Sequence, residues 1–303
     1  TYYQKETLNG EAHLMLLMIA TNVIIQLSFV LTQYKRKSWK IKLIEMCISI
    51  FFLRPAVDAY RVSSNHFDGE KTVGTMTEMI GNKCIELATE SIPGCVLQIY
   101  VSLNNPDQLN TLNIMSIATS AATTGFTSAM IGFDLDIDVK NRKDQPLAYG
   151  YIPDDNGART RCFYLMIVIS ALHNMNRSFG CALLAARDHK LVVLLIGVEW
   201  LLYLIYKYAR GDILYFPPFE GRRTLIASVV VRLVITIVAD FTGCLHARHP
   251  KEMGGIAFCV SMIWAQVFPF VMLQLFDGNS KGVITIILVC SLSLWCILNV
   301  AFF

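Results

Sequence analysis

The sequence predicts an all-α membrane protein, a bundle of transmembrane helices that includes a re-entrant, kinked helical hairpin. The 303 residues are 54% hydrophobic and 16% charged, with a mean hydropathy of +0.48, which is not the composition of a water-soluble domain. The apolar residues also fall in runs of about 20, the length of helix that crosses a bilayer. No run alternates between apolar and polar residues as a strand does.

Eight apolar runs are predicted to span the membrane within a single transmembrane domain. Their predicted bounds are 12–32, 43–62, 112–133, 162–186, 191–208, 225–245, 254–276 and 282–303. The first is continuous and is followed by a basic and aromatic cluster, while Arg54-Pro55 interrupts the second. The third is rich in Ser, Ala, Thr and Gly, which lets neighbouring helices approach closely. Among the last five runs, only 254–276 and 282–303 have no charge in their interior.

The remaining apolar stretch, 73–103, is predicted to enter the bilayer and return to the same side. Its first half carries charges among apolar residues, its second half is too short to cross the bilayer alone, and a Pro-Gly step separates the two. The residues in question are Glu78, Lys83, Glu86, Glu90, Pro93 and Gly94. Pro93 and Gly94 are the predicted hinge, because proline breaks the hydrogen-bonding pattern of a helix.

Counting Lys and Arg in the loops supports the hairpin. If 73–103 spans, the side that holds Lys35–Lys42 collects roughly 9 basic residues against about 13 on the other side. If 73–103 re-enters, one side of the membrane collects roughly 15 basic residues and the other about 7. The larger group comes from the loops around Lys35–Lys42, Lys140–Arg161, Lys207–Arg223 and Lys281. The second arrangement follows the positive-inside rule and predicts that the basic loops are cytoplasmic.

Ionisable residues inside predicted membrane segments are the candidate functional residues, because a charge in hydrocarbon is retained only for a reason. A polar track through the bilayer is one interpretation, and ion pairs that fix the helix packing are the other. The candidates for the track are Asp58, Glu78, Lys83, Glu86, Glu90, Arg177, Glu199, Arg232 and Asp240. Arg232 and Asp240 lie about two turns apart, so each is expected to pair with another helix.

Other classes of function have little support in the sequence. The chain shows no Ser-His-Asp order, no Gly-rich phosphate loop and no HExxH, so no enzyme and no cofactor is predicted. His173, the pair His246/His249 and the aspartates of 134–138 are weak metal candidates. The nine cysteines form no CxxC pair and are expected to be small apolar residues. A net charge of +3 is too small for a nucleic-acid partner.

One short motif resembles the XK-related family of membrane proteins. That family has a polar helix that reads roughly FxExxLESxPQLxLQLY, and Cys84–Pro93 with Val96–Tyr100 matches it. Ile117–Ser120 supplies the TS step that begins the following helix, Arg177 lies where the family has an arginine, and Glu199-Trp200 lies in the helix after that. The chain departs from the pattern at Gly94, where the family has Gln, and the family's first helix is absent.

The resemblance implies phospholipid scrambling, in which lipids move between leaflets without ATP along charged residues. The expected partners are membrane phospholipids, with an accessory membrane protein or a lipid-transfer protein as a further expectation. The alternatives are an ion or solute channel that uses the same carboxylates, and a scaffold that docks a lipid-transfer protein through loop 134–161. The plasma membrane is the expected location, with an internal membrane as the alternative. Because the sequence lacks an initial Met, it is expected to be part of a longer chain.

Overall fold

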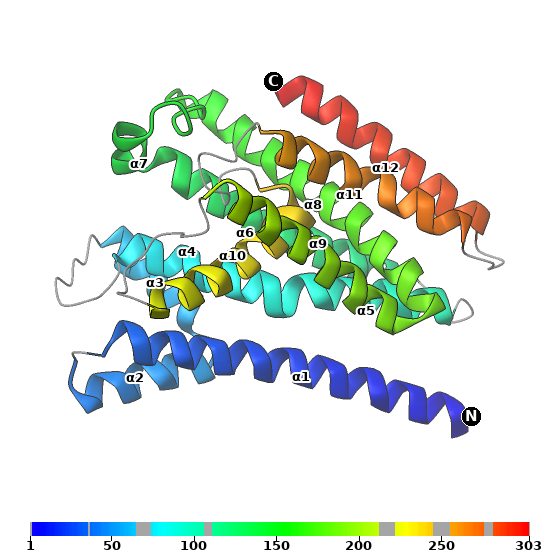
Figure 1. The fold of residues 1–303 in the computed structure, drawn as a ribbon, viewed down its shortest axis with the longest axis horizontal. Coiled ribbons are helices and arrows are strands. Elements are labelled where there is room, and N and C mark those ends of the chain that lie inside the picture. Colours follow the sequence, from blue (N-terminus) through cyan, green and yellow to red (C-terminus); the bar gives the residue numbers. More distant parts are fainter. Residues whose placement is uncertain are drawn as a thin grey trace. The chain divides into compact units, whose positions relative to one another are not determined.

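The computed structural model describes residues 2–35, 37–64, 74–105, 111–211, 222–244, 255–275 and 281–302. The regular structure in these ranges is helical (Figure 1). The residues group into two compact units, Thr1–Pro93 and Gly94–Phe303, and each has its own internal packing.

Four helices are long and apolar enough to cross a membrane. They are the segment Gly10–Gln33 of α1 (Tyr2–Gln33), α6 (Thr111–Ile137), α9 (His189–Ala209) and Lys281–Ala301 of α12 (Lys281–Phe302). These helices confirm the prediction of a helical membrane protein.

Three further helices cover most of the other predicted spans. They are α8 (Asn156–Arg187), α10 (Arg222–Thr242) and α11 (Ile256–Gln274). Their crossing of the membrane stays a prediction. The predicted ends at 245, 254, 276 and 303 lie outside the described residues, as does His246/His249.

The predicted span 43–62 is two short helices, α2 (Trp39–Ile50) and α3 (Arg54–Ser63). Pro55 lies in the first turn of α3, where its missing N–H has no helical partner to lose, and Phe52 adopts a left-handed φ of 57°. At 12 and 10 residues the helices reach about 18 and 15 Å, too short for a hydrocarbon core of about 30 Å. Arg61 near the end of α3 contacts Tyr34, which precedes α2, so the two helices form a hairpin.

The predicted hinge at Pro93-Gly94 is wrong as the apex of a hairpin. The helix α4 (Thr75–Glu86), a π-helical turn η1 (Leu87–Ser91) and α5 (Ile92–Asn104) follow one another without a non-helical residue. Pro93 has no N–H to donate to the preceding turn, and the helix accommodates it with π-type geometry, in which the Ile92 N–H bonds to Leu87 O. Residue 73 lies outside the described residues.

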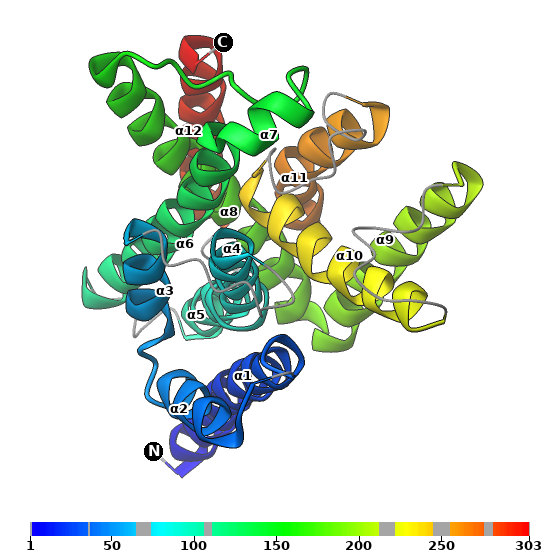
Figure 2. The same cartoon turned by 90° about the vertical axis from the view of Figure 1, so that its left-hand side faces the viewer.

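The long helix α8 is the core of the second unit. It packs against α6, α9, α10, α11 and α12, and it runs through the middle of these helices in Figure 2. A Cβ atom at Gly125 of α6 would lie 2.6 Å from the Ile167 carbonyl oxygen on α8. The prediction that small residues in 112–133 permit close helix packing is therefore confirmed.

An apolar core near one end of α8 joins four helices of this unit. Ile99 of α5, Phe179 and Leu183 of α8, Leu273 of α11 and Leu288 of α12 are buried together. All nine cysteines are free; four are buried, four are exposed and Cys162 is intermediate. The expectation that the cysteines act as small apolar residues of the interior is thus met by the four that are buried.

Candidate functional site

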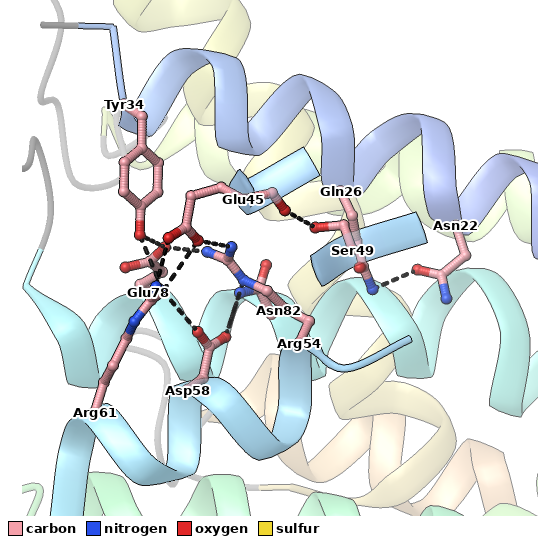
Figure 3. Close-up of polar contacts among 10 residues, drawn as sticks. All are labelled: Asn22, Gln26, Tyr34, Glu45, Ser49, Arg54, Asp58, Arg61, Glu78 and Asn82. Atoms are coloured by element: carbon pink, nitrogen blue, oxygen red, sulfur yellow. Dashed lines mark hydrogen bonds and ion pairs between the residues drawn. The ribbon is translucent and has the colours of Figure 1, made fainter. Parts of the chain in front are cut away.

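A buried ion cluster occupies the first unit, where α2, α3 and α4 meet (Figure 3). At its centre the Arg54 guanidinium, 1% exposed, donates to three carboxylates. Its partners are Glu45 at 2.7 Å, Asp58 at 3.2 Å and Glu78. Because a buried charge needs partners for each of its polar atoms, this arrangement ties α2 and α4 to the first turn of α3.

Three further side chains complete this group, which we call the Arg54 cluster. Arg61 pairs with Glu45 and donates to the Tyr34 hydroxyl at 3.1 Å. The Tyr34 hydroxyl in turn donates to Glu78 at 3.2 Å, and Asn82 donates to Asp58 at 2.7 Å. The cluster comprises Tyr34, Glu45, Arg54, Asp58, Arg61, Glu78 and Asn82.

Two predicted track residues, Asp58 and Glu78, are therefore held inside a network of ion pairs. They are 3% and 1% exposed, which matches the structural interpretation of the charges more closely than the interpretation as a track. Sequence reasoning missed Glu45, although a carboxylate inside the predicted span 43–62 was a visible signal.

A buried polar stripe on α1 was also missed. Asn22 and Gln26 are 2% and 8% exposed, and Gln26 donates to the Asn22 side chain at 3.1 Å (Figure 3). Asn22 donates to the Glu90 carboxylate at 2.6 Å. The four-residue spacing places both amides on one face of the helix, and that spacing was present in a run interpreted only as apolar.

Lys83, Glu86 and Glu90 differ from the Arg54 cluster because each is only half-buried. Glu86 lies close enough to Glu90 and to Lys83 for their charges to interact with its own. The predicted ladder of acidic residues thus divides. Glu78 belongs to the buried ion cluster, while Glu86 and Glu90 remain on a partly accessible face beside the amides of α1.

In the second unit an ion pair joins α8 to α9. Arg177 is 2% exposed and pairs with Glu199, and the Trp264 indole N–H of α11 donates to Glu199 at 2.6 Å. The Phe268 and Phe241 ring centres lie 4.9 and 5.4 Å from the Arg177 guanidinium carbon, within the range of cation–π attraction. The predicted residues Arg177 and Glu199 are therefore brought together.

Arg232 and Asp240 contact different helices, as predicted for Arg232. Arg232 is 1% exposed and donates to the Tyr203 hydroxyl of α9 at 2.8 Å. The Asp240 carbonyl lies 3.1 Å from His173 Nε2, and His173 Nδ1 lies 2.9 Å from the Gln266 amide. His173 is fully buried, so it works as an interhelical hydrogen-bonding residue.

Two of the aspartates named as weak metal candidates, Asp136 and Asp138, accept hydrogen bonds from backbone N–H groups of the segment that follows them. The Asp136 carboxylate accepts N–H groups from Gly150, Tyr151 and Ile152 at 2.9, 3.2 and 2.9 Å. Asp138 accepts from the Asn141 N–H at the start of α7 (Val139–Asp144).

Comparison with protein-family models, with curated proteins and with solved structures finds no match. The resemblance to the XK-related family therefore stays a prediction that rests on residues 84–100.

Proposed function

We propose that this protein is a passive phospholipid scramblase. The observation that supports the proposal is the half-buried face of Lys83, Glu86 and Glu90 on the unbroken helix 75–104. Partly accessible charges of both signs lie there, and the side-chain amide of Asn22 on α1 contacts Glu90. Such a face has no role in a helix that only packs against lipid, where each charge is unfavourable by a few kcal/mol.

A lipid headgroup that crosses the hydrocarbon needs polar partners along its route while its acyl chains stay in lipid. Lys83 is suited to the phosphate group, and Glu86 and Glu90 are suited to the cationic amine of phosphatidylserine, phosphatidylethanolamine or phosphatidylcholine. The outer side of α1 is apolar, with Leu16, Leu17 and Ile24 each more than 60% exposed. It offers the acyl chains the environment that they need.

The buried charges take a different role in this proposal. Because Asp58 and Glu78 are ion-paired within the Arg54 cluster, and Arg177 with Glu199 in the second unit, they position helices. We assign the contact with headgroups to Lys83, Glu86 and Glu90.

The experiment is a scrambling assay with purified protein in liposomes that contain a fluorescent phospholipid. An impermeant reductant bleaches the outer leaflet, and bleaching beyond that share measures scrambling. Glu86→Gln/Glu90→Gln should slow it, because the amides keep the shape of the side chains but not the charge. Asp144→Asn, which changes an exposed carboxylate at the end of α7, is the matched control. Bleaching that stops at the outer leaflet in wild type would refute the proposal.

A cation channel is the second candidate, since Glu86 and Glu90 are close enough for their charges to interact and a cation between them would relieve the repulsion. A current that vanishes in the same double variant, with no scrambling in wild type, would favour the channel.

A further inference from the structure

The loop between α6 and α8 has a fixed internal framework. As described above, Asp136 accepts three N–H groups from residues 150–152, and it is fully buried. Arg142 spans the same loop, donating to Asp136 O at 2.7 Å, to Ile152 O at 3.0 Å and to the Asp154 carboxylate at 3.0 Å. Gly150 makes the turn with a φ of +94°, a conformation that glycine adopts without strain.

This framework presents apolar side chains that the loop itself does not cover. Leu147 is 91% exposed and Tyr151 is 67% exposed. The two are neighbours, because the Tyr151 hydroxyl donates to Leu147 O at 2.6 Å. Val139, the first residue of α7, is 78% exposed. Unlike the exposed leucines of α1, these residues lie outside the helices long enough to span a membrane, so hydrocarbon does not account for them.

Residues 138–155 carry four aspartates and three basic residues, and three of the aspartates are engaged within the protein. Asp138 and Asp155 accept N–H groups at helix starts, and Asp154 pairs with Arg142 and Arg159. Lys140 and Lys143 are exposed and have no ion pair among the described residues, and Asp144 is the exposed carboxylate beside them. Two lysines next to exposed apolar and aromatic side chains suit an anionic lipid surface.

We propose that residues 138–155 bind the anionic headgroup layer of the membrane that α6 enters, with Leu147 and Tyr151 among the headgroups and Lys140 and Lys143 against lipid phosphates and carboxylates. Continuity supports this partner, since the loop begins one residue after Ile137, the last residue of a helix long and apolar enough to span. The proposal does not depend on lipid transport.

The test places an environment-sensitive fluorescent amino acid at position 147 of the full chain, where high exposure makes the change harmless to folding. The protein is reconstituted in phosphatidylcholine vesicles with and without phosphatidylserine. A nitroxide on the lipid headgroup should quench the fluorophore strongly, and aqueous iodide several-fold less. Phosphatidylserine in the vesicles should reduce the quenching by iodide further. Lys140→Gln/Lys143→Gln should remove the dependence on phosphatidylserine, whereas Asp144→Asn should strengthen it.

Three results would overturn the proposal. Quenching by iodide but not by the headgroup nitroxide would place the loop in water. Protection from both quenchers would show that protein covers the loop, either a second copy or a soluble lipid-transfer protein. Equal quenching by the headgroup nitroxide in vesicles with and without phosphatidylserine would exclude an anionic partner.

Discussion

At the scale of single residues, the charges divide into those that are fully paired and those that remain accessible. Arg54 serves three carboxylates and is almost completely buried. Glu86 and Glu90 are half-buried. In a low-dielectric environment the first arrangement is stable only while every partner is present. The second can exchange partners, which the proposed passage of a headgroup would require.

Replacing Arg54 should therefore destabilise the protein more than any change at Glu86. In Arg54→Met three carboxylates lose a shared cation, and we expect a loss of about 3–5 kcal/mol. The measurement is thermal unfolding in detergent, with Glu86→Gln as the comparison. Equal melting temperatures for Arg54→Met and wild type would contradict the arrangement of the Arg54 cluster.

Several site residues could be predicted from the sequence, and their partners could not. The positions of Glu78, Arg177 and Glu199 in apolar runs identified them as unusual. Glu78 pairs with Arg54, and Glu199 accepts a hydrogen bond from Trp264. Both contacts depend on how the helices pack, which the order of residues does not specify. Asn22 and Gln26 were overlooked because two amides change the average hydropathy of a long apolar run very little.

At the scale of helices, the close contact of α6 and α8 depends on Gly125. A Cβ atom there would lie 2.6 Å from Ile167 O and 2.7 Å from Ala171 N, both backbone atoms. We expect Gly125→Val to lower the stability by about 1–3 kcal/mol through overpacking.

Gly197 of α9 is the matched control for this change, because nothing lies within 4 Å of its added Cβ. Gly197→Ala should be neutral or stabilising by up to about 1 kcal/mol. Unfolding of both variants in detergent measures the difference, and a tolerated Gly125→Val would refute the close packing of α6 on α8.

Two prolines have different effects on the helices, and the sequence did not distinguish them. Pro55 begins α3 and helps to divide a predicted span, whereas Pro93 lies inside continuous helix. Before Pro55 the chain turns at Phe52, which has a left-handed φ. Before Pro93 the helix continues and adopts π-helical geometry. The prediction of a hairpin turn at Pro93 is therefore wrong, and the described helices that turn back on each other are α2 and α3.

The hairpin of α2 and α3 can be tested by chemical labelling. Its ends, Ser38 and Ser64, are exposed, and both should lie on one side of the membrane because neither helix is long enough to cross. Cysteines placed singly at these positions should react with an impermeant thiol reagent from the same side. The parent protein gives the background from native cysteines, and labelling from opposite sides would contradict the hairpin.

At the scale of the whole chain, moving the hairpin keeps the later basic loops on the same side as Lys35–Lys42. If α2 and α3 return to their own side and helix 75–104 crosses instead, the loops around Lys140–Arg161, Lys207–Arg223 and Lys281 still fall on the side of Lys35–Lys42, as the positive-inside rule requires. In this arrangement the pair α2–α3 replaces 73–103 as the element that does not cross. The prediction that these loops are cytoplasmic then depends on α2–α3.

Lipid scrambling by wild-type protein is the property on which the functional proposal depends most. The decisive measurement records, on the same liposomes, bleaching of a fluorescent phospholipid and leakage of an enclosed soluble dye. We predict bleaching well beyond the outer leaflet without dye leakage, and slower bleaching in Glu86→Gln/Glu90→Gln but not in Asp144→Asn. Bleaching that stops at the outer leaflet, or that occurs only with leakage of the dye, would contradict the assignment.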